Sequence, residues 1–242
     1  SDIDTREDEV RRLQELERQQ EARAIIEVEG EGDRQYLTGL YMGGKHVLIA
    51  LDASASMLAE SIINVLRRRH MSEERKLASP KWQRALATVS WLTAQIPVES
   101  HVQIVTFNTE LKTVFLNEDW VAAIEADRID TAIEGLSEKT PENGTNLLIL
   151  FNHIAAMDPR PDNVFLIIDS LPTQSSREPR KAVVTGQKRF EYFRDAVEEL
   201  PQGIPINVIM FPMEGDPQAS AAYWNLARIT EGTYMSPSRD WP

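Results

Sequence analysis

The chain of 242 residues contains no cysteine. This absence excludes a disulfide framework, a zinc site built from thiolates and a cysteine nucleophile. It leaves the localisation unknown, because a protein without cysteine is compatible with both reducing and oxidising compartments. Long apolar runs are missing too: none reaches the ~18–20 residues that a membrane-spanning helix needs, so we expect no membrane insertion by this segment. The acidic residues after Ser1 do not fit a secretory signal, and the segment is compatible with being part of a longer, anchored protein.

Positive charge is scarce. The 26 lysines and arginines face 38 acids, which gives a formal net charge of -12. Binding to nucleic acid needs a basic face that replaces counterions, so we expect no nucleic-acid partner. Residues 1–35 alone carry twelve acids and six arginines, and therefore about half of the net charge.

Residues 5–29 are rich in Glu, Arg and Gln and predict a solvated helix. Val10, Leu13 and Leu16 form a thin apolar stripe that does not continue. Two interpretations stay open: a stalk or coiled coil through which the chain self-associates, or a charged helix that lies on the domain or frays. We therefore predict an acidic helical extension over residues 1–35 and one domain over residues 36–242.

Four continuous apolar runs follow His46 and predict buried parallel strands. They cover residues 46–52, 102–107, 164–169 and 206–211. Helical patterns are found at about 80–96, 146–157, 188–200 and 217–230, and residues 111–116 predict an antiparallel edge strand after a hairpin. This alternation predicts an α/β fold class, a doubly wound, Rossmann-like and mostly parallel sheet of about six strands flanked by helices.

Polar residues follow two of these runs. Asp52 ends the first run and Asp169 ends the third, and the carboxyl ends of strands form the ligand crevice of such a sheet. Ser54 and Ser56 follow Asp52 at alternate positions, so their oxygens can converge, and Thr145 precedes a predicted helix on the same side. A set made only of oxygens suits Mg²⁺, Mn²⁺ or Ca²⁺ and is poor for zinc.

The order Asp-x-Ser-x-Ser, then Gly-Thr, then a strand-terminal Asp resembles the metal-ion-dependent adhesion site of von Willebrand factor A and integrin I domains. The resemblance covers roughly residues 45–237, including Thr230-Glu231-Gly232-Thr233-Tyr234, which is similar to the last helix-to-strand turn of such domains. It implies that Ser54, Ser56 and Thr145 coordinate one ion, Mg²⁺ or else Mn²⁺ or Ca²⁺, directly or through water. It implies also that Asp52 and Asp169 orient these ligands from behind.

What the resemblance implies about function is a divalent-metal-dependent protein-binding module, in which an Asp or Glu carboxylate of a partner protein completes the coordination of the ion. The ion then joins the two proteins and catalyses nothing. In relatives, movement of the last helix is coupled to metal coordination, which implies an affinity that can be switched.

Two features depart from the family pattern. Ile168-Asp169-Ser170 replaces the usual Thr-Asp-Gly, and residues 57–79 have the length of an insertion at the metal rim. Arg67, Arg68, Arg69, Arg75 and Lys76 in the insertion, and Arg177, Arg180, Lys181, Lys188 and Arg189 after Asp169, predict a basic rim that favours an acidic partner. The alternative is that these charges are scattered over ordinary solvated loops.

Other functions fit the residues less well. A scaffold that oligomerises through the N-terminal helix would need the metal only for stability, or not at all. A Mg²⁺-dependent phosphotransferase would need a second acid two residues after Asp52, where Ser54 stands. We therefore expect a binding module and not an enzyme.

Overall fold

The computed structural model describes residues 27–30, 34–37, 40, 42–115, 120–176 and 183–242. The chain divides into two compact units, residues 1–41 and 42–242. Our predicted boundary, between residues 35 and 36, stays a prediction.

In the first unit, strands β1 (Glu27–Gly30) and β2 (Arg34–Leu37) pair antiparallel. The predicted helix over residues 5–29 lies outside the described residues up to residue 26. Residues 27–29 form a strand and not a helix, because they pair with β2.

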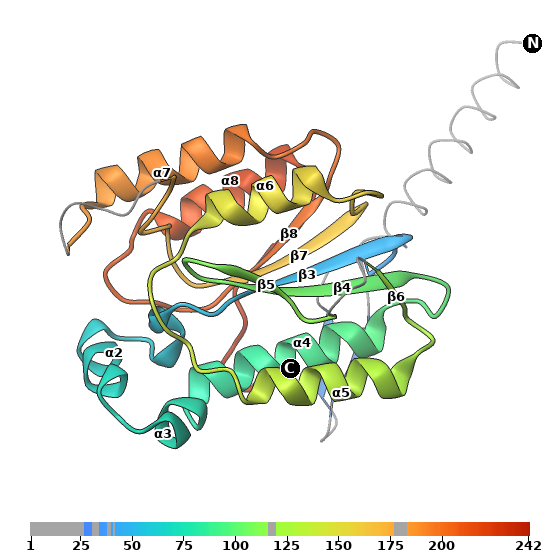
Figure 1. Ribbon diagram of the computed structural model, residues 1–242, viewed down its shortest axis with the longest axis horizontal. Coiled ribbons are helices and arrows are strands. Elements are labelled where there is room, and N and C mark those ends of the chain that lie inside the picture. The colour runs from blue at the N-terminus through green and yellow to red at the C-terminus, as the bar shows by residue number, and fades with distance from the viewer. Residues whose placement is uncertain (1–26, 31–33, 38–39, 41, 116–119, 177–182) are drawn as a thin grey trace, which may run out of the picture. The chain divides into compact units, whose positions relative to one another are not determined.

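The second unit contains a seven-stranded sheet, of which five strands are parallel (Figure 1). Strands β3, β4, β7, β8 and β9 form the parallel part, and the short strands β5 and β6 pair antiparallel with β4. The sheet order is β5-β4-β3-β7-β8-β9. The strands span His46–Asp52 (β3), His101–Phe107 (β4), Leu111–Thr113 (β5), Val121–Ala122 (β6), Asn163–Ile168 (β7), Ile206–Met210 (β8) and Tyr234–Met235 (β9). The predicted fold class is confirmed, with β6 as an addition.

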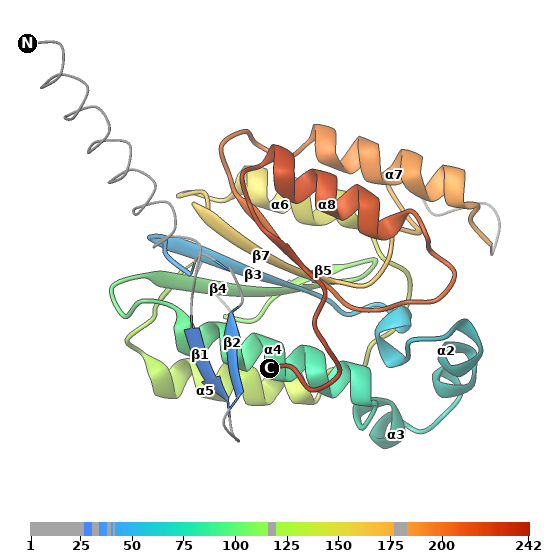
Figure 2. The same ribbon diagram turned by 180° about the vertical axis from the view of Figure 1, so that it is seen from behind.

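Helices cover both faces of this sheet. Helices α6 (Leu147–Ala156), α7 (Gly186–Glu198) and α8 (Ala219–Ile229) lie on one face, and α4 (Pro80–Gln95) and α5 (Ala126–Ser137) on the other (Figures 1 and 2). A 3₁₀ turn, η1 (Ala55–Leu58), and two short helices, α2 (Ile62–Arg69) and α3 (Glu73–Leu77), follow β3. None of the helices in the described part of the chain is long and apolar enough to cross a membrane.

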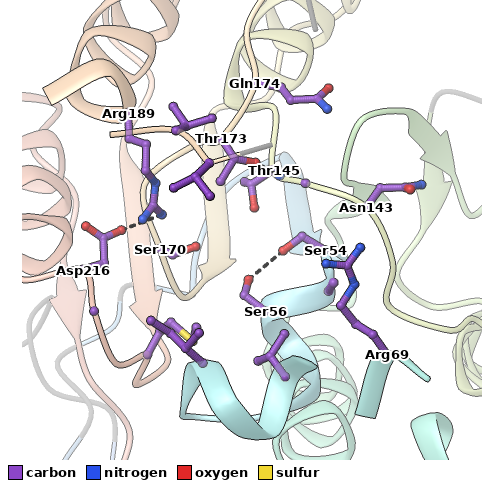
Figure 3. A pocket seen from close by; sticks show the side chains of 18 of the residues that line it. Ser54, Ser56, Arg69, Asn143, Thr145, Ser170, Thr173, Gln174, Arg189 and Asp216 are labelled. Carbon is purple, nitrogen blue, oxygen red and sulfur yellow. Dashed lines mark hydrogen bonds and ion pairs between the residues drawn. The ribbon is translucent and has the colours of Figure 1, made fainter. Parts of the chain in front are cut away.

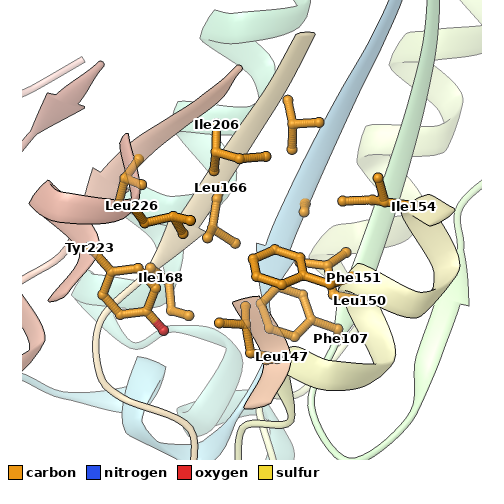
Figure 4. Packing of buried hydrophobic residues seen from close by; sticks show 14 of the residues in the cluster. Phe107, Leu147, Leu150, Phe151, Ile154, Leu166, Ile168, Ile206, Tyr223 and Leu226 are labelled. Carbon is orange, nitrogen blue, oxygen red and sulfur yellow. The ribbon is translucent and has the colours of Figure 1, made fainter. Parts of the chain in front are cut away.

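The two faces of the sheet are filled by alternate residues of the same strands, because successive side chains of a strand point to opposite sides. Leu48 and Ala50 of β3 belong to the core beneath α6, α7 and α8, which also contains Phe151 and Tyr223 (Figure 4). The buried Trp82 belongs to the helix on the opposite face. Burial on both faces explains why the predicted strands are continuous apolar runs.

The position of the ligand crevice follows from the connections. Helix α4 leads from β3 to β4 on one face, whereas α7 leads from β7 to β8 on the other. The strand order therefore reverses between the adjacent strands β3 and β7, and the carboxyl ends of these two strands form the switch point at which such sheets bind ligands.

Candidate functional site

Three loops meet at the switch point and are joined by backbone hydrogen bonds. The loop after β3 meets the loop before α6, where the Ala55 N–H donates to the Asn143 carbonyl over 3.0 Å. The loop after β7 is joined to the same segment, where the Thr173 N–H donates to the Thr145 carbonyl over 2.9 Å. A Cβ at Gly144 would overlap the Thr173 hydroxyl, so this close approach favours glycine. These contacts fix the side chains that the three loops carry.

Asp52 orients two of the predicted ligands. Its carboxylate is fully buried, and one oxygen accepts a hydrogen bond from the Ser54 N–H at 2.8 Å. The other oxygen accepts one from the Thr145 hydroxyl at 3.2 Å. This carboxylate therefore ties the first loop to the second.

Asp169 has a similar role on the other side of the site. One carboxylate oxygen accepts a hydrogen bond from the Ser56 hydroxyl at 2.8 Å, and the Ser54 and Ser56 hydroxyls lie 2.9 Å apart. The second oxygen lies 2.6 Å from the Lys81 ammonium. The five residues predicted from the sequence are thus joined by one chain of hydrogen bonds, and a lysine joins it at one end.

Sequence reasoning missed Lys81, the second residue of α4. The signal was its register: Lys81 stands four residues before Ala85 and seven before Thr88, and all three are buried. A lysine on the buried stripe of a helix needs a partner, because an isolated buried charge is costly. Asp169 is that partner.

The donor set fits a hard divalent ion. Figure 3 shows the Ser54, Ser56 and Thr145 side chains around one space, and both carboxylates stand directly behind these hydroxyls. Among the described residues, no three His, Cys, Asp or Glu side chains gather into a group that could hold a metal, so protein hydroxyls and water would have to supply most ligands. That mixture suits Mg²⁺. The three hydroxyl residues would hold the ion, and the two acids would orient them.

The hydroxyls open into a cavity of about 550 Å³. Its wall includes four charged residues, Arg69 and Arg189 with Glu214 and Asp216. The other described members of the predicted basic rim do not line it: Arg68 donates to the Ser79 hydroxyl, and Lys188 pairs with Glu191. Arg177, Arg180 and Lys181 lie outside the described residues. Over the described wall the charges balance, so the prediction of a basic rim is corrected for the described residues, because five of its seven described cations do not line the cavity.

The insertion contributes an apolar side to the cavity. Ile62, Val65 and Arg69 of α2 line the cavity wall. Val65 is the buried hydrophobic residue of this helix, whereas Ile62, Ile63 and Leu66 are 48%, 62% and 52% exposed. Residues 57–79 thus fold into η1, α2 and α3 beside the hydroxyls, and α2 exposes apolar side chains next to them.

Burial raises the pKa of Asp52 to about 7, with a further increase from the nearby Asp169 charge; hydrogen bonds from Ser54 and Thr145 oppose the shift. The folded protein therefore holds this proton more tightly than the unfolded chain. As pH rises from about 4 to about 7, the unfolded chain loses the proton first, so the free energy of unfolding should fall over this window.

We expect this fall in EDTA-treated protein, measured by urea unfolding at a series of pH values. Asp52→Asn should remove the contribution of Asp52 and flatten the slope. A slope that is equal in both proteins would contradict the prediction.

Comparisons with known proteins show likeness in structure only. No protein-family profile and no curated protein matches the sequence. The PilB minor pilin from Streptococcus sanguinis has 15% identity and a TM-score of 0.50, covering 88% of this chain and 63% of that one. A von Willebrand factor type A structure from Catenulispora acidiphila has 13% identity and a TM-score of 0.48, and the match covers 84% of this chain and 40% of that one. The conserved hypothetical protein BatB from Bacteroides thetaiotaomicron has 18% identity and a TM-score of 0.46, and the match covers 81% of this chain and 91% of that one.

The predicted fold class is confirmed: the second unit has a mostly parallel α/β sheet flanked by helices, which is consistent with a von Willebrand factor A-type, Rossmann-like fold. The order of its strands, with one antiparallel edge beside a parallel core, and the helices on both faces are those of a doubly wound sheet. The turn Thr230–Tyr234 joins α8 to β9, as the resemblance implied.

Proposed function

We propose that this chain is a protein-binding module that holds one divalent ion, Mg²⁺ or else Mn²⁺ or Ca²⁺, and captures a carboxylate of a partner protein through it. The observation that supports this proposal most is the convergence of the Ser54, Ser56 and Thr145 hydroxyls in front of two buried acids. Hydroxyl ligands leave the charge of the ion largely uncompensated, so an open position attracts an anionic oxygen.

The surroundings of the hydroxyls suit a protein segment. The cavity opens beside the exposed apolar side of α2, so an acidic side chain of the partner would enter while neighbouring apolar residues pack on Ile62 and Leu66. The lining contains no histidine among the described residues, and Ser54 stands where a phosphotransferase needs its second acid. The proposal therefore includes no catalysis.

The first test is calorimetric titration of EDTA-stripped protein with Mg²⁺ and Mn²⁺. The wild type should bind one ion. Thr145→Ala and Asp52→Ala should weaken binding by roughly tenfold or more, because one removes a ligand and the other an orienting carboxylate. Thr109→Ala is the matched control, since Thr109 lines the same cavity outside the hydrogen-bonded chain.

Circular dichroism would verify that each variant is folded. Equal affinity in Thr145→Ala and the wild type would contradict the proposed ligand set. Partner capture should then require the metal, and it should be lost with Thr145→Ala but kept with Thr109→Ala.

A further inference from the structure

Lys81 forms a complete set of contacts inside the site. Its ammonium donates to the carbonyl oxygens of Ser56 and Ala59, each at 3.1 Å, and to Asp169 at 2.6 Å. An ammonium has three N–H donors, so these three oxygens satisfy all of them. Lys81 is 3% exposed, and water is therefore no alternative partner.

The two carbonyls that Lys81 contacts belong to the first loop of the site. Ser56 lies within η1 and Ala59 directly follows it, and η1 begins inside the Asp-x-Ser-x-Ser segment. The ammonium therefore binds the first loop at two points and the Asp169 carboxylate at a third. It holds three oxygens from two loops, as a bound cation would, and it does so from α4, a separate helix on one face of the sheet.

The charge balance follows from these contacts. Asp52 and Asp169, when ionised, give the site a charge of −2, and Lys81 reduces it to −1. A divalent ion then brings the site to +1, and a single partner carboxylate neutralises it. Without Lys81, the divalent ion alone would neutralise the two acids and leave less attraction for a partner.

We propose that Lys81 is an internal cation of the site, which holds the Ser56 loop against Asp169 and lowers the affinity for a divalent ion so that ion and partner carboxylate bind best together. This inference rests on the metal-binding function proposed above. It makes Lys81 a positioning residue, because it acts through Asp169 and the loop and not by touching the ion.

The test compares Mn²⁺ titrations of wild type, Lys81→Met and Lys81→Gln, using the full chain after EDTA treatment. Removing a unit charge a few ångströms away should tighten Mn²⁺ binding by about tenfold or more, from the Coulomb energy at an effective dielectric near 20. Lys81→Gln keeps two N–H donors without the charge, so it remains useful should Lys81→Met fold poorly. Lys76→Met, in α3 and outside the cavity lining, is the matched control.

Thermal unfolding supplies a second readout. In EDTA, Lys81→Met should melt below the wild type because Asp169 loses its partner, and saturating Mn²⁺ should raise the melting temperature more in the variant than in the wild type. Lys76→Met should change neither property.

The outcomes separate the two proposals. Tighter Mn²⁺ binding in a folded Lys81 variant supports the inference, even where wild-type binding is too weak to detect. Unchanged or weaker binding, with wild-type binding intact, overturns the role of Lys81 and leaves the proposed function standing. Absence of binding in the wild type and in both folded variants overturns the proposed metal site and this inference with it.

Discussion

Gly232→Ala is expected to lower the free energy of unfolding by about 3 kcal/mol or more, the upper range for overpacking a site without room. A Cβ at this position would overlap the carbonyl oxygen of Ile206 and lie 2.8 Å from its nitrogen. These are backbone atoms at the start of β8, so no side chain can rotate away. The strand or the turn must move.

Neither the turn nor the strand can move without loss. Thr233 donates to the Asn207 side chain from both its N–H and its hydroxyl, at 3.1 and 2.8 Å. The Thr230 hydroxyl accepts from the Ile206 N–H at 3.1 Å, and the Gly232 N–H donates to the carbonyl of Ala227 in α8 at 2.8 Å. Ile206 also contributes to the core beneath α8 (Figure 4).

Thermal unfolding in EDTA measures this effect without the metal. For a chain of this size, the expected loss corresponds to a melting temperature lower by roughly 6–12 °C. Gly135→Ala is the control: a Cβ there meets nothing within 4 Å, and alanine favours the helix. Equal melting temperatures for Gly232→Ala and Gly135→Ala would show that the turn yields easily.

The elements that the sequence predicts well are those in which burial and pattern agree. Strands β3, β4, β7 and β8 are buried on both faces and are mostly apolar, so their approximate ends, and the positions of Asp52 and Asp169, could be predicted from the sequence. Ser54 and Ser56 follow from their place after the first of these ends, and Thr145 from its place before the predicted helix at about 146–157. The structure brings these five residues together, although their role as metal ligands stays a prediction.

The missed elements share a different property: each of them buries only one or two side chains. Helix α2 exposes Ile62, Ile63 and Leu66, so its apolar residues do not mark a buried face. Helix α5 has Ile129 and Leu136 as its buried residues, and strand β6 covers two residues that pair with β4. Tertiary contacts form these elements, and a local pattern does not report such contacts.

The incorrect prediction of a basic rim has the same cause, because it rested on a local pattern. A run such as Arg67-Arg68-Arg69 shows that cations are present but not where they point, and on a helix consecutive residues face different directions. Lys81 is the opposite case, a single lysine with no run around it, which is buried against Asp169. Charge counts therefore predicted a basic rim, whereas the contacts show a wall whose charges balance over the described residues and a buried lysine paired with Asp169.

Asp216→Ala is expected to have the second-largest effect on the free energy of unfolding. It should also change the metal affinity of the site. Asp216 accepts from the Leu171 N–H at 2.7 Å and pairs with Arg189 at 2.8 Å, while Arg189 donates to the Leu171 carbonyl at 2.6 Å. This triangle joins the loop after β8 and helix α7 to the loop after β7. That loop carries Asp169 and holds Thr145 through Thr173.

Removing the carboxylate leaves a largely buried guanidinium and a backbone N–H without a partner, since the Arg189 side chain is 16% exposed. Because some solvent reaches Arg189, we expect a loss of about 2–3 kcal/mol, below the cost of breaking a fully buried pair. The double variant Arg189→Met with Asp216→Ala should lose less than Asp216→Ala alone, because no unpaired charge remains. Urea unfolding in EDTA measures all three proteins.

The site should respond through the loop. Asp216 lines the cavity but belongs to none of the hydrogen bonds between the five predicted residues, so a weaker Mn²⁺ affinity in Asp216→Ala would come from the position of the loop. Glu214→Ala is the matched control, because Glu214 is an exposed acid on the same wall. Equal stability and equal Mn²⁺ affinity in the two variants would mean that only the lost acidic charge matters. A larger loss of stability and of Mn²⁺ affinity in Asp216→Ala would show that the triangle holds Thr145 and Asp169 in position.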